Sequence, residues 1–135
     1  MPEVKPLILV VDDETHILHV VSLKLRNAGY DVVTAENGEE GFDLAVQRVP
    51  RLIITDFQMP FMTGLEMCQR LKTDDRTANV QAFMLTARGF SLPAEALEKT
   101  NIVTVLSKPF SPKEVLAKVQ ELLGGQVASG GAKAT

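Results

Sequence analysis

The sequence predicts an α/β fold, doubly wound, in which helices cover both faces of a parallel sheet. Short apolar runs alternate five times with segments whose apolar residues recur at helical spacing. Strands that alternate with helices of this length are typical of βαβ units, which place their strands parallel. The length of 135 residues supports one such domain.

Five strands are expected, each a short run built around apolar and β-branched residues. The first run, Leu7-Ile-Leu-Val-Val11, is continuous and has no polar alternation, which is typical of a strand buried on both faces. In chain order, the five runs occupy residues 7–11, 31–35, 51–55, 80–85 and 102–106.

The first two helices are expected between the first three strands. The apolar stripe from Ile17 to Ala28 is closed by Gly29, at the place where a glycine often follows a helix. After the second strand, Asn37-Gly38 is expected as a turn, and the helix that follows stops at Pro50.

The later helices carry clearer start signals. Thr63-Gly-Leu-Glu66 and Ser111-Pro-Lys-Glu114 are capping boxes, in which a hydroxyl and a glutamate each bond a backbone N–H at the helix start. Pro93 suits the first turn of a short helix that ends near Thr100.

One domain is expected over residues 1–123. Residues 124–135 are mostly glycine, alanine and serine, which is typical of a flexible tail or linker. This tail is too short for an output domain. We therefore expect a stand-alone protein or a domain taken from a longer one.

Composition excludes several classes of protein. With 14 basic and 17 acidic residues, the net charge of −3 leaves no electrostatic footprint for nucleic acid or for an anionic membrane. One cysteine cannot form an internal disulfide, and the apolar run at 7–11 is too short for a membrane span. We expect a cytoplasmic protein with no direct contact to nucleic acid or membrane.

Polar side chains stand where four of the predicted strands end. Asp12 and Asp13 follow the first strand, Asp56 the third, Thr86 the fourth and Lys108 the fifth. Ligands of open α/β sheets bind at this carboxyl edge. A single polar residue at this edge needs no functional explanation. Sheet ends also host small and apolar residues, however, so a whole group of polar residues there indicates a functional site.

These residue types suit phosphoryl transfer. Three carboxylates in one pocket repel each other, and a hard divalent cation such as Mg²⁺, which prefers oxygen ligands, relieves that repulsion. Aspartate can act as a nucleophile that forms an aspartyl-phosphate, lysine supplies a compact positive charge for phosphate oxygens, and a threonine hydroxyl can donate to them.

Four motifs on this frame resemble those of the bacterial response regulator receiver domain, the CheY-like kind. The resemblance covers about residues 7–123 and implies a (βα)5 flavodoxin-like fold with strand order 2-1-3-4-5. The motifs are Val11-Asp-Asp-Glu14, Asp56-Phe-Gln-Met-Pro-Phe-Met-Thr-Gly64, Leu85-Thr-Ala87 and Ser107-Lys-Pro-Phe110.

The resemblance implies a phosphoacceptor module of a two-component system or phosphorelay. Asp56 would take a phosphoryl group from a histidine kinase or a histidine phosphotransfer protein. Asp13, Asp56 and the backbone carbonyl of Gln58 would bind Mg²⁺ directly, and Asp12 would act through a metal-bound water. Such a module catalyses only its own phosphorylation and dephosphorylation, so no turnover of another substrate is expected.

The resemblance also implies how the phosphoryl group is held and read. Lys108 and Thr86 would contact phosphoryl oxygens, together with backbone N–H groups of Gln58 and Ala87, and the Lys108–Pro109 peptide would be cis. A downstream protein would bind the face made by the fourth helix, fifth strand and fifth helix. The chain would be a monomer or a phosphorylation-dependent dimer.

One position departs from the family pattern. The family usually has Tyr or Phe three residues before the lysine, where this chain has Val105. The usual switch between the threonine and an aromatic ring therefore cannot operate as such, and Thr86 with Val105 would form a different or weaker switch. Gln58 and Arg88 occupy positions that tune phosphoryl lifetime in the family.

Other functions fit less well. A scaffold of the pseudo-receiver kind, which binds partners without phosphorylation, is favoured only by Val105. An aspartate-nucleophile phosphatase of the haloacid dehalogenase type needs a second aspartate where this chain has Gln58. A nucleotide-binding protein would need a glycine-rich phosphate motif, and the chain has none.

Several further residues receive ordinary structural interpretations. His16 and His19 lack further metal-ligating neighbours and are expected to be solvated or packed, and Cys68 is expected in the core. The apolar residues after Asp56 are expected mainly to cover the start of the third helix, and less as a partner surface. These residues are Phe57, Met59, Phe61 and Met62.

Overall fold

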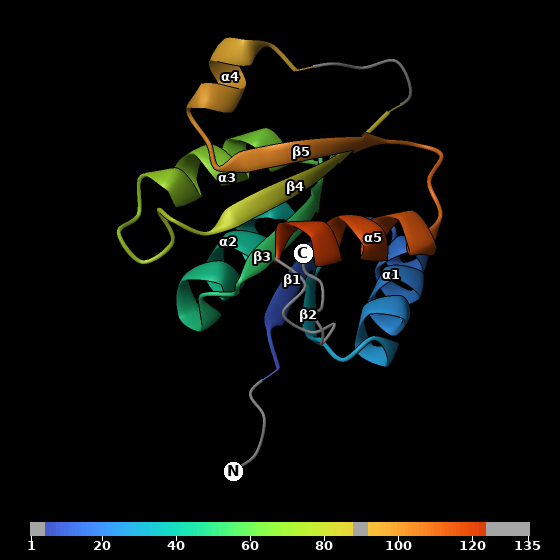
Figure 1. Cartoon of the computed structure of the whole chain (residues 1–135). Coiled ribbons are helices and arrows are strands. Elements are labelled where there is room, and N and C mark those ends of the chain that lie inside the picture. The colour runs from blue at the N-terminus through green and yellow to red at the C-terminus, as the bar shows by residue number, and fades with distance from the viewer. Residues whose placement is uncertain (1–4, 88–91, 124–135) are drawn as a thin grey trace.

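The computed structural model describes residues 5–87 and 92–123. Within these ranges the strands all pair parallel, in the order β2-β1-β3-β4-β5, which confirms the predicted sheet (Figure 1). The predicted tail at 124–135 and Arg88 lie outside the described residues. In chain order, the elements are β1 (Leu7–Val11), α1 (Thr15–Asn27), β2 (Asp31–Ala35), α2 (Gly38–Arg48), β3 (Leu52–Asp56), α3 (Gly64–Lys72), β4 (Gln81–Thr86), α4 (Ala94–Glu98), β5 (Ile102–Ser107) and α5 (Pro112–Leu122).

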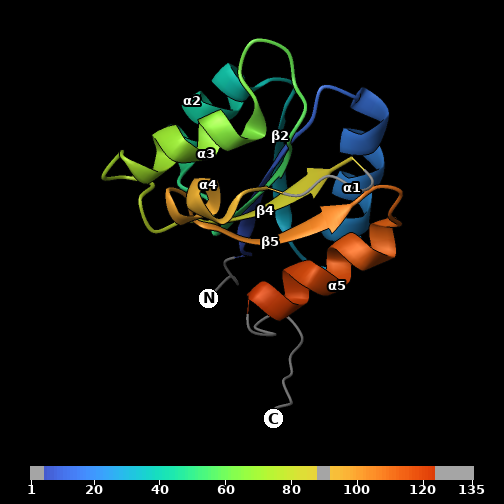
Figure 2. The same ribbon diagram turned by 90° about the horizontal axis from the view of Figure 1, so that it is seen from above.

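Helices cover both faces of the sheet. Helices α1 and α5 pack together on one face, and α2 and α3 pack together on the other (Figures 1 and 2). Strand β1 is sandwiched between these layers, and Ile8, Leu9, Val10 and Val11 are fully buried. The continuous apolar run of the first strand thus has the two-sided burial that its composition predicts.

Alternate residues of each central strand feed two separate cores. Ile8 and Val10 belong to the cluster under α1 and α5, whereas Leu9 and Val11 belong to the cluster under α2 and α3. This division follows from the two-residue repeat of a strand. Cys68 lies in the second cluster, as expected, and burial raises the pKa of its thiol to about 12.

The Asn37-Gly38 pair does not form the predicted turn. Asn37 is the N-cap of α2, its side chain accepts a hydrogen bond from the N–H of Glu40 at 2.8 Å, and Gly38 is the first helical residue. Asparagine before glycine suits both roles, because its side chain can replace a backbone acceptor in a turn or at a helix start. Because a helix begins at Gly38, the side chain of Asn37 acts as a helix cap and not as part of a turn.

Three strands run one residue further than the sequence predicts. Asp56 is the last residue of β3 and pairs with Leu85, and Thr86 of β4 pairs with Ser107 of β5. Asp56 and Thr86 therefore sit on strand ends rather than in loops, whereas Asp12, Asp13 and Lys108 follow the ends of β1 and β5. None of the described helices is long and apolar enough to span a membrane.

Candidate functional site

The carboxyl edge of the sheet brings together three carboxylates. Asp12 follows β1, and its N–H donates to the carbonyl of Ala35 at the end of β2, at 3.1 Å. Asp13 is the next residue, and Asp56 ends the neighbouring strand β3. One carboxylate oxygen from each of these residues lies within 4.8 Å of the others. This spacing suits oxygen ligands around one cation.

Two of these carboxylates are removed from solvent. Asp12 has no exposed surface, and Asp56 is 3% exposed, whereas Asp13 is exposed. The N–H of Glu14 donates to Oδ1 of Asp12 at 2.9 Å, but Oδ2 of Asp12 has no hydrogen-bond partner among the described residues. A buried acceptor without a partner is costly, so the residues present fit a cation whose bound water could donate to this oxygen.

Burial disfavours the charged forms of these acids. Desolvation is the main cause that raises the pKa of Asp12 from 3.8 to about 7, and the nearby Asp56 adds to it while the Glu14 hydrogen bond opposes it. Desolvation also raises the pKa of Asp56, against the opposing hydrogen bond from Lys108. The buried pocket therefore favours the neutral form of both acids, and added positive charge would favour their charged forms.

Lys108 supplies one positive charge. Its Nζ lies 2.9 Å from Oδ1 of Asp56 and 3.6 Å from Oε1 of Glu14. Burial lowers the pKa of Lys108, but the hydrogen bond and charge of Asp56 outweigh burial, and the net shift is upward. The lysine N–H donates to the carbonyl of Thr86 at 2.8 Å, and the Lys108–Pro109 peptide is cis, as expected.

Thr86 lies beside this pair at the end of β4. It is 1% exposed, and its Oγ1 has no hydrogen-bond partner in the part of the chain that the structure describes. Gln58 and Ala87 are both exposed and follow β3 and β4. The structure thus brings the predicted side chains to one edge, with the backbone of Gln58 and Ala87 next to them in sequence.

The loop after β3 is tied to the neighbouring strand β4 and closed on itself. The N–H of Phe57 donates to the carbonyl of Leu85, and the N–H of Gly64 donates to the carbonyl of Phe57, each at 2.9 Å. A Cβ on Gly64 would lie 2.2 Å from the carbonyl oxygen of Asp56. Only glycine allows this approach.

The comparisons with known proteins agree on the family. Residues 8–120 match the response regulator receiver domain family. The chain belongs to this family. It is 42% identical over 118 residues to the DNA-binding dual master transcriptional regulator RpaA of Synechocystis sp., an alignment that covers 87% of this chain and 49% of RpaA.

Solved structures share the receiver fold. The chemotaxis response regulator CheY4 of Vibrio cholerae is 30% identical, with a TM-score of 0.81 over 88% of this chain and 99% of that one. The receiver domain of sensor histidine kinase PA1611 of Pseudomonas aeruginosa, solved with a magnesium ion coordinated in its active site cleft, is 23% identical. Its TM-score is 0.79 over 90% of this chain and 99% of that one, and at this identity the likeness concerns the fold.

The receiver domain spans about half the length of the curated relatives it matches. RpaA is named as a DNA-binding protein, so the expected lack of contact with nucleic acid remains a prediction that concerns the residues of this domain alone.

Sequence reasoning assigned no role to two residues of the site. Glu14 contacts Lys108, and its position directly after Asp12-Asp13 is the only sequence signal for this contact. Thr55 is fully buried, and its Oγ1 donates to the carbonyl of Asp56 at 3.0 Å, which helps to hold the strand end. A threonine inside an apolar strand gives little sign of such a bond.

Val105 occupies the place of the family's aromatic residue. It lies on β5 opposite Met84 and packs, partly buried, against the core cluster under α2 and α3.

His16 and His19 are exposed on α1, which agrees with their expected solvated role.

Proposed function

We propose that this receiver domain accepts a phosphoryl group on Asp56 from a phosphohistidine of a histidine kinase or a histidine phosphotransfer protein. The observation that carries the proposal is the contact between Lys108 Nζ and Asp56 Oδ1 at 2.9 Å, beside the carboxylates of Asp12 and Asp13. A nucleophilic carboxylate, a fixed cation and a cluster of metal-ligating oxygens are the parts that phosphoryl transfer needs.

The chemistry at Asp56 is a single displacement at phosphorus. An oxygen of the Asp56 carboxylate forms a bond to phosphorus while the bond between phosphorus and the imidazole nitrogen breaks, and that electron pair stays on the nitrogen. The ammonium of Lys108 is placed to meet the charge of the phosphoryl oxygens. Asp56 sits at the end of a buried strand, so its orientation is fixed before the reaction.

Magnesium fits the same edge. Asp12, Asp13 and Asp56 would hold it, with the carbonyl of Gln58, and Oδ2 of Asp12, which has no hydrogen-bond partner among the described residues, supports this assignment. When bound, Mg²⁺ supplies positive charge that neutralises phosphoryl oxygens.

The response to phosphorylation would begin at Thr86. Its buried Oγ1, which lacks a partner among the described residues, is available to donate to a phosphoryl oxygen on the neighbouring strand end. Movement of this side chain would reach Val105 and the adjacent face of β5, where we place the surface that regulates a downstream protein. In the same proposal, the domain acts as a monomer or as a phosphorylation-dependent dimer.

Intact-mass measurement after incubation with acetyl phosphate and Mg²⁺ tests the proposal. The wild-type domain should gain one phosphoryl group, and Asp56→Asn should gain none. Asp43→Asn is the matched control, because Asp43 is an exposed acid on α2. A phosphoryl group that persists on Asp56→Asn would contradict the acceptor assignment.

A further inference from the structure

Phe61 is the one member of an apolar group after Asp56 that the fold leaves in solvent. Met59 is buried, and Phe57 and Met62 pack against the core cluster under α2 and α3. The side chain of Phe61 is fully exposed, at 103%. Three of these four residues therefore pack into or against this core, which includes residues of α3, and the fourth contributes no burial to the fold.

The backbone at Phe61 is also unfavourable for this residue. Its φ of 69° lies in the left-handed region, and Val49 is the other described non-glycine residue with a positive φ. Glycine and asparagine adopt this conformation at lower cost than phenylalanine does. A residue that has strained backbone and no packing is not explained by stability, and such outliers point to function.

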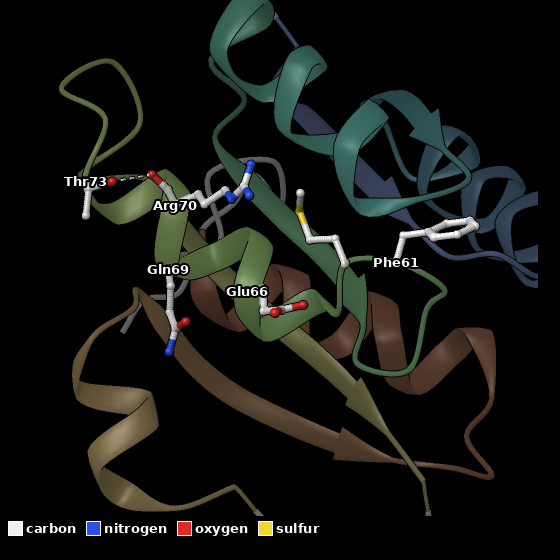
Figure 3. Close-up of a pocket in the computed structure, with 6 residues that line it drawn as sticks. Phe61, Glu66, Gln69, Arg70 and Thr73 are labelled. Atoms are coloured by element: carbon white, nitrogen blue, oxygen red, sulfur yellow. Dashed lines mark hydrogen bonds between the residues drawn. The ribbon is translucent and has the colours of Figure 1, made fainter.

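A nearby hollow does not account for Phe61 either. A hollow of about 370 Å³ lies along α3, lined by Phe61, Met62, Glu66, Gln69, Arg70 and Thr73. Four of its six lining residues are polar or charged, and Thr73 Oγ1 donates to the carbonyl of Arg70 at 2.9 Å. Figure 3 shows the Phe61 ring pointing away from the labelled α3 side chains, so the ring does not fill this hollow.

The location of Phe61 connects it with the phosphorylation site. It stands five residues after Asp56, on the loop that Gly64 ties to Phe57 beside the strand end. Figure 2 shows this loop, in green, projecting beyond the sheet. Because Asp56 is 3% exposed, a protein that delivers a histidine to its carboxylate must approach closely enough to cover the surrounding loops.

We propose that Phe61 is a docking residue for the phosphohistidine protein that phosphorylates this domain, an inference that rests on the proposed function. The ring would enter an apolar pocket of the donor beside its phosphohistidine. An aromatic side chain has few rotatable bonds, and exposed aromatic residues often dominate binding at protein interfaces. A small donor such as acetyl phosphate reaches Asp56 without this contact.

A comparison of two phosphoryl donors, one small molecule and one protein, tests whether Phe61 acts in docking of the protein rather than in the transfer reaction. We would compare wild type, Phe61→Asn and the conservative Phe61→Tyr, with acetyl phosphate and with a purified histidine kinase core, phosphorylated on histidine, that transfers to wild type. Asparagine tolerates the left-handed backbone, so Phe61→Asn should fold. Val49→Asn is the matched control, because Val49 shares the positive φ and partial exposure but precedes β3, at the opposite edge of the sheet.

Phe61→Asn should be labelled by acetyl phosphate at the wild-type rate, but its transfer rate from the kinase core at low domain concentration should fall about tenfold or more. Phe61→Tyr should retain most of the transfer rate, and Val49→Asn all of it. Equal transfer to Phe61→Asn and wild type would overturn this inference alone. A phosphoryl group that either donor places on a residue other than Asp56 of wild type would overturn the proposed function, and this inference with it.

A second copy of the chain is the competing occupant of this surface. Light scattering on the same variants distinguishes it. If wild type forms a dimer that Phe61→Asn abolishes while transfer from the kinase core is unchanged, Phe61 serves self-association and the docking proposal is wrong.

Discussion

The Nζ atom of Lys108 lies 2.9 Å from Oδ1 of Asp56, so the ammonium just beyond β5 meets the carboxylate at the end of β3. Strand β4 lies between these two strands and contributes Thr86 to the same edge. The contact therefore depends on the parallel register of three strands. It also explains how an acid that is almost fully buried keeps a partner for its charge.

Loss of this contact should weaken the fold. Lys108→Ala leaves the buried Asp56 carboxylate without its cation, and we expect the free energy of unfolding at neutral pH to fall by about 1–2 kcal/mol. Lys118→Ala is the control, because Lys118 forms a surface pair with Glu121 at 3.6 Å; its loss should cost less than about 0.5 kcal/mol. Urea unfolding followed by circular dichroism measures both, and equal losses would contradict the assigned role of Lys108.

The acidic pocket should make stability depend on pH and Mg²⁺. The pKa of Asp12 is raised from 3.8 to about 7, so the contribution of this acid to stability is complete below pH 3.8 and is lost as the pH rises through about 7. Without Mg²⁺, wild type should therefore lose stability relative to Asp12→Asn as the pH rises across this range. Unfolding curves of both proteins at several pH values test this, and parallel curves would contradict it.

Millimolar Mg²⁺ should stabilise wild type, because the ion binds the folded pocket and not the open chain. The increase in melting temperature should grow as the pH rises, since Asp12 must lose its proton before its negative charge can help to hold the ion. Asp12→Asn should show a much smaller increase, and Asp43→Asn, on the surface of α2, should match wild type. An equal increase in all three proteins would exclude a specific site.

The alternation of strands and helices was predictable because it depends on local periodicity. The run at Leu7–Val11 has the two-sided burial that its composition indicates, and the capping boxes at Thr63 and Ser111 both form. Local patterns did not distinguish a turn from a helix cap at Asn37, because both use the same side-chain acceptor. The helix that begins at Gly38 makes Asn37 a helix cap.

The polar edge was predictable as a group, because parallel strands bring their carboxyl ends together. Contacts between side chains were not. The approach of Glu14 to Lys108 depends on distances across the site that no sequence spacing encodes. The same limit applies to Phe61: inside a loop neither the helical nor the strand repeat applies, so the sequence does not show which apolar residue faces outward.

Gly64 should be intolerant of a side chain. Gly64→Ala places a methyl group against the carbonyl of Asp56, and we expect it to lower the free energy of unfolding by about 2–3 kcal/mol and to slow labelling by acetyl phosphate. Gly29→Ala is the control, because Gly29 has a φ of 103° but lies at the end of α1; it should cost about 1 kcal/mol and leave labelling unchanged. Wild-type labelling of Gly64→Ala would show that the loop tolerates displacement.

Relief of the strain at Val49 should stabilise the domain. Val49 has a φ of 43° and is 46% exposed, so Val49→Asn should raise the free energy of unfolding by about 0.5–1 kcal/mol. Val103→Asn tests the specificity of this effect, because Val103 is similarly exposed but lies in the ordinary strand conformation of β5. We expect that change to be destabilising. A loss of stability in both variants would contradict the role of backbone strain.

The most direct test of the account is to locate the phosphoryl group chemically. Borohydride reduces an aspartyl-phosphate to homoserine, which peptide mass spectrometry can assign to one residue. After the domain is phosphorylated with acetyl phosphate and Mg²⁺, we expect homoserine at position 56 and unmodified Asp12 and Asp13. Homoserine at either of those residues instead, or its absence from a domain that carries the phosphoryl mass, would contradict the assignment of Asp56 as the acceptor.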